Sequence, residues 1–249
     1  EVVGLACYAC GTGAAHAAIE KRLKSGDALV GVDPSEPALW TARMRDAPAG
    51  LSVVYEHASE LPSPLRSGSF THATIVHPTG PDATRAQLLD DAFRVLQPGG
   101  QLVLTMPVRG SFPELLDLVR EYATKRDAPA LTAGADEASE ARPSIETLAD
   151  ELTRAGFEDV DMDVQLLAIP FPSGKAYANS AVSRLAVGPD LAALLGVDPE
   201  LARRAADYTT DAIGKYWSES PFELVVNVGC AVGWVPGTPP RGSVPPLEA

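Results

Sequence analysis

Short apolar runs alternate with amphipathic stretches through roughly the first 160 residues of this chain. The apolar runs predict buried strands near Val2–Ala9, Ala28–Val32, Leu51–Tyr55, His72–His77 and Gln101–Met106. Apolar residues at helical spacing predict helices near Ala14–Lys24, Glu36–Arg45, Ala83–Val95, Phe112–Lys125 and Ile145–Ala155. Strands that alternate with helices are typical of an α/β protein with a parallel, doubly wound (Rossmann-like) sheet.

The last third of the chain has a different pattern. We expect a sixth strand over Phe157–Ile169, a mostly helical insertion over about 174–217, and a last strand over Phe222–Val232. The last strand is nearly continuous in apolar residues, which indicates burial on both faces. The insertion is long for a simple connection, so we expect it to form a substrate lid or a partner surface.

Two weakly patterned segments complete the expected organisation. Ala128–Pro143 is rich in small and acidic residues and predicts a mobile loop. Residues 236–249 are rich in proline and predict a tail or linker after one domain over residues 1–235. The chain opens on Glu1 inside a predicted strand, so we expect a trimmed chain or one part of a longer protein.

The charge excludes several kinds of partner. A net charge of -13 over 249 residues repels phosphate backbones and anionic membranes, so we expect neither a nucleic acid nor a membrane as partner. No apolar run is long enough to span a bilayer, and no secretory signal is visible. The three cysteines lack a disulfide framework, which favours a reducing, cytoplasmic location. A small-molecule substrate or a protein partner fits best; the pattern indicates no oligomeric state.

The most informative local feature is a glycine-containing turn. Ala9-Cys10-Gly11-Thr12-Gly13 follows the first predicted strand and precedes the first helix, and Asp33 closes the second strand. Glycines let the backbone approach a ligand closely, and a carboxylate at a strand end can hold both hydroxyls of a ribose. The arrangement predicts a nucleoside-binding half-domain, with a Rossmann-like turn that binds nothing as the alternative.

With three further motifs, this turn resembles the class I S-adenosylmethionine-dependent methyltransferases, especially the ubiquinone/menaquinone-biosynthesis-like group (methyltransferase type 11-like). The further motifs are Gly31-Val32-Asp33-Pro34-Ser35-Glu36-Pro37, Ala58-Ser59-Glu60-Leu61-Pro62 and Val95-Leu96-Gln97-Pro98-Gly99-Gly100. The resemblance covers nearly the whole chain. It implies a seven-stranded sheet flanked by helices, with the last strand antiparallel. It also implies methyl transfer from S-adenosylmethionine to a small molecule.

The resemblance also implies site residues. The cofactor would contact the turn (Ala9, Gly11, Thr12, Gly13), the end of the second strand (Asp33, Pro34) and the end of the third (His57, Ala58). Gly11 and Gly13 would let the backbone pass under the methionine portion and the ribose, Asp33 would hold the ribose hydroxyls, and His57-Ala58 would lie beside the adenine. His16 stands where an NAD-binding turn needs a small residue, which counts against NAD.

Four positions depart from the family pattern. Cys7 stands where the family usually has an acidic residue, Ala9 replaces the first glycine, His57 replaces the adenine-side aspartate, and Thr71 replaces the acid that usually opens the fourth strand. Lost polar contacts of about 1–3 kcal/mol each would weaken cofactor binding by several powers of ten. The alternative function is therefore a catalytically inactive methyltransferase-like domain that serves as a protein-interaction or regulatory module.

Other candidate chemistry is sparse. His77 follows the fourth strand, where ligands of such sheets bind, so it is a further candidate contact, with a structural role as the alternative. Cys7 and Cys10 have the spacing of a redox pair, but a strand position favours buried, inert thiols. His16 is expected to help the first helix pack. No zinc spacing is present, and methyl transfer works chiefly by positioning, so we assign no metal and no catalytic residue.

Overall fold

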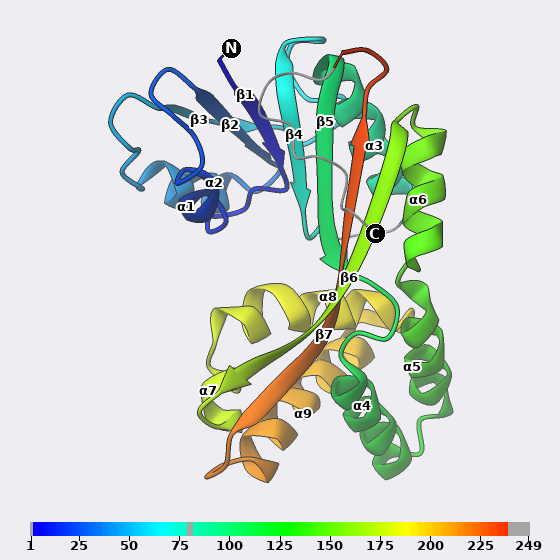
Figure 1. Cartoon of the computed structure of the whole chain (residues 1–249). Coiled ribbons are helices and arrows are strands. Elements are labelled where there is room, and N and C mark those ends of the chain that lie inside the picture. Colours follow the sequence, from blue (N-terminus) through cyan, green and yellow to red (C-terminus); the bar gives the residue numbers. More distant parts are fainter. Residues whose placement is uncertain (1, 79–81, 239–249) are drawn as a thin grey trace. The chain divides into compact units, whose positions relative to one another are not determined.

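The predicted alternation of strands and helices is present in the computed structural model, which describes residues 2–78 and 82–238 (Figure 1). The chain divides into two units, each with a core of its own. The first comprises Glu1–Met106, Ile145–Asp163 and Gly229–Ala249; the second comprises Pro107–Ser144 and Val164–Val228. Both units lie largely within the domain predicted over residues 1–235. Most of the predicted tail, residues 239–249, falls outside the described residues.

The first unit is organised around a seven-stranded sheet with the order β3-β2-β1-β4-β5-β7-β6 (Figure 1). The strands are β1 (Gly4–Tyr8), β2 (Ala28–Asp33), β3 (Ser52–His57), β4 (Phe70–Val76), β5 (Leu96–Pro107), β6 (Glu158–Phe171) and β7 (Phe222–Trp234). The pairs formed among β1 to β5 are parallel, and β7 runs antiparallel. The sheet confirms the predicted fold class.

Helices α1 (His16–Ile19), α2 (Glu36–Arg43), α3 (Asp82–Val95) and α6 (Ile145–Arg154) also belong to the first unit. Helix α1 is much shorter than the predicted Ala14–Lys24. Its N-cap, Ala15, offers no side chain to the free amides of the first turn, and the first turn carries no acidic residue. Helix α2 is better delimited, because the Ser35 side chain accepts a hydrogen bond from the backbone N of Ala38.

The second unit is mostly helical. It contains α4 (Pro113–Arg126), α5 (Pro129–Ala141), α7 (Gly174–Ala178), a π-helical turn (Val182–Val187), α8 (Gly188–Leu194) and α9 (Pro199–Tyr216). The parts of β6 and β7 from Val164 onward and up to Val228 also belong to it. The predicted helical insertion therefore shares its core with α4 and α5. None of the described helices is both long and apolar enough to cross a membrane.

The mobile loop predicted over Ala128–Pro143 is wrong. Most of that segment forms α5, whose residues Leu131, Ala135 and Ala138 are buried in the core of the second unit. Small side chains allow a helix to approach its neighbours closely, so a helix can be well packed without the large apolar residues that make a pattern visible.

One substitution in α5 tests whether this segment forms the packed helix or the predicted mobile loop. A Cβ atom on Gly134 would lie 2.3 Å from the backbone O of Leu195, so Gly134→Ala should destabilise the protein by about 1–3 kcal/mol. Helix propensity alone predicts the opposite sign. Gly214→Ala in α9 is the matched control: its Cβ would meet only Ala178, at 3.9 Å, so we expect a gain of up to about 1 kcal/mol. Urea unfolding of both variants measures the difference, and stabilisation by both would contradict the packing of α5.

Candidate functional site

Most of the predicted site residues lie at one edge of the sheet in the first unit. The turn Ala9–Gly13 follows β1, while Asp33 and His57 are the last residues of β2 and β3. Asp33 and His57 are direct partners in the parallel register. The carboxyl ends of parallel strands form the usual ligand-binding edge of such a sheet, so the sequence prediction places these residues together for a physical reason.

Asp33 holds the glycine turn in place. Its Oδ2 accepts a hydrogen bond from the backbone N of Gly11 at 2.8 Å, and its Oδ1 accepts one from the backbone N of Ser35 at 2.8 Å. The residue is only 8% exposed. Each carboxylate oxygen has two acceptor sites, so each can accept one further hydrogen bond. Asp33 is therefore fixed in orientation and keeps acceptor capacity for a ligand with two adjacent hydroxyls.

Gly11 gives this edge an open surface. Its φ of +52° lies in the left-handed region that glycine tolerates best. A Cβ atom on Gly11 would meet no other atom within 4 Å, so the backbone here borders open space. Thr12, the next residue, is exposed. A ligand can thus approach the backbone at Gly11 beside the Asp33 carboxylate.

Ala9, which stands where the family pattern has its first glycine, adopts a strained backbone conformation. Its φ of +52° places a residue with a Cβ in the left-handed region, at a cost of about 1–2 kcal/mol. The turn therefore keeps the backbone path that a glycine would take. The alanine makes that path costlier and leaves it otherwise intact.

Ala9→Gly is expected to raise the free energy of unfolding by up to about 1 kcal/mol, because the relieved strain exceeds the added entropy of the unfolded chain. Ala14→Gly, in the same turn but without a positive φ, is the matched control and should lose about 0.4–1 kcal/mol. Chemical denaturation of both variants tests the prediction. Equal losses in both would show that Ala9 is not strained.

Gly13 is required for a different reason from the one that the family resemblance implies. A Cβ atom on Gly13 would lie 2.9 Å from Tyr55 Oη and 3.3 Å from Arg45 Cδ. Its φ is +70°. Protein side chains thus fill the space beside this glycine, so its small size lets the turn pack onto Tyr55 and Arg45.

His57 and Ala58 both connect to the end of β2. The Nε2 of His57 donates to the backbone O of Pro34 at 3.0 Å, which fixes the proton on Nε2 because a carbonyl can only accept. The backbone N of Ala58 donates to the backbone O of Asp33 at 3.2 Å. Four of the predicted site residues, Asp33, Pro34, His57 and Ala58, therefore lie in one hydrogen-bonded group with Gly11.

The fourth strand contributes less to this group. His77, the residue after β4, has a φ of +48°, and its backbone N donates to the backbone O of Thr105 at 2.7 Å, which ties it to β5. Thr71 lies at the opposite end of β4, where its Oγ1 bonds both the backbone N and the backbone O of Gly4. The presence of Thr71 in place of the family's acid therefore removes no contact from the sheet edge where Asp33 lies.

Cys7 and Cys10 are buried beneath the turn. They pack with Leu39, and burial raises the pKa of the Cys7 thiol to about 11 and that of Cys10 further. Both remain protonated near neutral pH, in agreement with inert thiols. Cys7 therefore occupies the position of the family's acid as an uncharged core residue.

His16 is also buried beneath the turn, where it helps α1 pack, as predicted. It is fully buried, stacks on Tyr55 and shares a hydrogen bond of 3.0 Å between Nδ1 and Tyr55 Oη. Burial, and secondarily the charge of Arg45, lowers the pKa of His16 to about 4, so the ring is neutral. Tyr55 and Arg45 were missed by sequence reasoning, since only the folded chain brings them beneath the turn.

Comparisons with known proteins relate this chain to a protein family, to a curated relative and to solved structures. Residues 6–100 match the family described as a methyltransferase domain. A demethylmenaquinone methyltransferase from Thermus thermophilus is 33% identical over 107 residues, which are 42% of this chain and 48% of that protein. The chain thus spans about half the length of this curated relative.

Solved structures share the fold over nearly the whole chain. The YcgJ protein from Bacillus subtilis superposes with a TM-score of 0.53 at 12% identity, covering 94% of this chain and 92% of that one. The phosphoethanolamine N-methyltransferase 2 of Haemonchus contortus, in complex with S-adenosyl-L-methionine, gives 0.51 at 16% identity, covering 94% and 49%. At these identities the likeness concerns the fold.

Proposed function

We propose that this chain, whose residues 6–100 match the family described as a methyltransferase domain, binds S-adenosylmethionine and transfers its methyl group to a small molecule. The match to a methyltransferase domain supports this type of reaction.

The observation that carries the proposal is the pairing of Asp33 with Gly11. The carboxylate is oriented by the Gly11 amide at 2.8 Å, and the backbone at Gly11 borders open space. A ribose offers two adjacent hydroxyl donors, which match the two acceptor sites that Asp33 keeps. Charge-assisted hydrogen bonds of this kind contribute about 1.5–3 kcal/mol each, which is enough to set cofactor affinity.

His57 fits the adenine side better than its replacement of an aspartate suggests. Nε2 donates to the Pro34 carbonyl, so in the neutral imidazole Nδ1 is a hydrogen-bond acceptor. An aspartate also offers only acceptors to a ligand, so the polarity is kept while one charge is lost. The residues at this edge therefore suit a nucleoside, with weaker electrostatic attraction than a second carboxylate would give.

When bound, the cofactor supplies an activated methyl group that an acceptor atom attacks in line. The contribution of this chain is to orient: Asp33 and the Gly11 backbone hold the ribose, and His57 and Ala58 border the base. Positioning of this kind lowers the barrier without a dedicated acid or base. We therefore assign no residue to proton transfer.

Calorimetric titration with S-adenosylmethionine and S-adenosylhomocysteine tests binding, and transfer of a labelled methyl group to candidate small molecules tests the reaction. We expect saturable binding with a Kd on the order of micromolar to tens of micromolar. No heat and no thermal shift at about 1 mM of either ligand would contradict the proposal. That outcome would favour the alternative of a protein-interaction module.

A further inference from the structure

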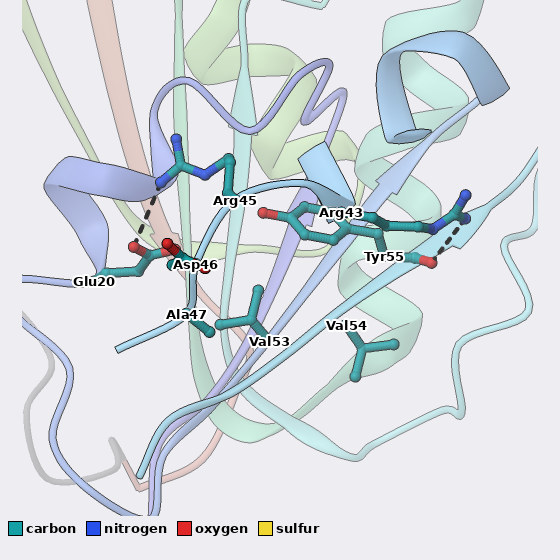
Figure 2. A pocket seen from close by; sticks show the side chains of 8 residues that line it. All are labelled: Glu20, Arg43, Arg45, Asp46, Ala47, Val53, Val54 and Tyr55. Carbon is teal, nitrogen blue, oxygen red and sulfur yellow. Dashed lines mark hydrogen bonds and ion pairs between the residues drawn. The ribbon is translucent and has the colours of Figure 1, made fainter. Parts of the chain in front are cut away.

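A cavity of about 300 Å³ lies against the edge strand β3 (Figure 2). Its walls come from the end of α1, the end of α2 with the following loop, and three residues of β3. The lining residues are Glu20, Arg43, Arg45, Asp46, Ala47, Val53, Val54 and Tyr55. None of them is assigned to the cofactor site. Pockets for small molecules have volumes of about 300–1,000 Å³, so the cavity suits a ligand of amino-acid size.

The cavity has a charged end and an apolar flank. Glu20, Arg45 and Asp46 gather at one end, and Val53 and Val54 lie further along β3 (Figure 2). The charged end therefore presents both signs within a small space. A ligand that matches it carries an anionic and a cationic group close together, with an apolar group beyond them.

Hydrogen-bonding capacity at the charged end is not used up by the protein. Arg45 reaches Glu20 at 3.4 Å, longer than the roughly 2.7–2.9 Å of a good charge-assisted bond. Its Nη1 makes no hydrogen bond among the described residues and, unlike Nε, is not fully buried. Asp46 makes no hydrogen bond or ion pair with any residue of 2–78 or 82–238. A donor and an acceptor are thus both available to a ligand.

Arg43, the other cation of the lining, is already engaged. It bonds Glu36 at 2.5 Å and the backbone O of Tyr55 at 3.2 Å. The contrast with Arg45 locates the ligand's anionic group, since the one bond that Arg45 makes is the long contact with Glu20.

We propose that this cavity binds a free α-amino acid with an aliphatic side chain. The carboxylate accepts hydrogen bonds from Arg45, and the ammonium group donates to Glu20 and Asp46. The side chain lies against Val53. This binding is separate from the proposed methyl transfer and does not depend on it.

L-leucine is the probe, titrated into the full chain and followed by backbone amide NMR shifts. We expect saturable shifts at Asp46, Val53 and Val54. Three analogues each lack one feature: 3-methylbutylamine lacks the carboxylate, 4-methylpentanoate lacks the ammonium group, and glycine lacks the side chain. Each should bind at least about tenfold more weakly.

Substitutions locate the site. Arg45→Gln and Asp46→Asn should each weaken leucine binding at least about tenfold. Arg66→Gln, at an exposed arginine before β4, is the matched control and should leave binding unchanged. Arg45 also packs beside Gly13, so Arg45→Gln could disturb the fold. Asp46→Asn changes an exposed side chain and keeps the test decisive.

Three results would overturn the proposal. The first is an absence of saturable binding at about 10 mM L-leucine. The second is equal affinity for leucine and its three analogues. The third is a set of shifts confined to Gly11, Gly13 and Asp33, which would place the amino acid in the cofactor site instead.

Discussion

Asp33→Asn is expected to weaken S-adenosylmethionine binding by about two to four powers of ten. The carboxylate is the only acidic side chain that we place at the cofactor-binding edge, and it is oriented by the backbone amides of Gly11 and Ser35. Loss of the charge weakens two hydrogen bonds to the ribose, at about 1.5–3 kcal/mol each. The amide of asparagine also presents a donor where the protein and the ligand both present donors. Calorimetry measures the change in Kd.

Asp90→Asn is the matched control for this experiment, because Asp90 is an exposed carboxylate on α3 of the same unit. It should leave the affinity unchanged. Thermal unfolding of both variants separates lost binding from lost folding, since Asp33 also supports the turn. Unaltered affinity in a folded Asp33→Asn protein would show that the ribose does not bind at this edge.

Asp91→Ala is expected to cost about 3–5 kcal/mol of unfolding free energy. The carboxylate is buried and accepts hydrogen bonds from Tyr8 Oη at 2.8 Å, the backbone N of Ser63 at 3.0 Å and Arg94 Nε at 2.7 Å. Its removal leaves the Tyr8 hydroxyl without its strongest acceptor in the core and Arg94 without its counter-charge. Urea unfolding gives the magnitude.

The neighbouring Asp90→Ala change provides the comparison, since it removes the same group from the exposed side of the same helix. Surface substitutions usually alter stability by less than about 0.5 kcal/mol. A loss in Asp91→Ala as small as that in Asp90→Ala would mean that the buried network does not stabilise the fold.

The strands could be predicted because their side chains report directly on burial. Buried parallel strands need continuous apolar runs, and β1, β2 and β4 are short runs of this kind. Helix α5 gave no such signal, because its buried face is made of alanines, a glycine and a single leucine. Close packing of small residues depends on neighbours far away in the sequence, which periodicity does not record.

The candidate site divides in a similar way. Asp33 and Gly11 were predictable, since a strand end and a turn fix their positions through local backbone geometry alone. The roles of Gly13 and Tyr55 were not, because they come from side chains that meet only when α1, α2 and β3 pack together. The strain at Ala9 also needs the observed φ, as the sequence shows only a small residue in a turn.

The order of the sheet has a consequence for synthesis on the ribosome. Strand β7 lies between β5 and β6, yet it is made after both of them. Until residues 222–234 emerge, the hydrogen-bonding edge of β5 has no native partner and β6 cannot join the sheet. Unpaired apolar edges are prone to aggregate. The nascent chain thus depends on residues 222–234 for protection, and expression of chains truncated before β7 should yield insoluble protein.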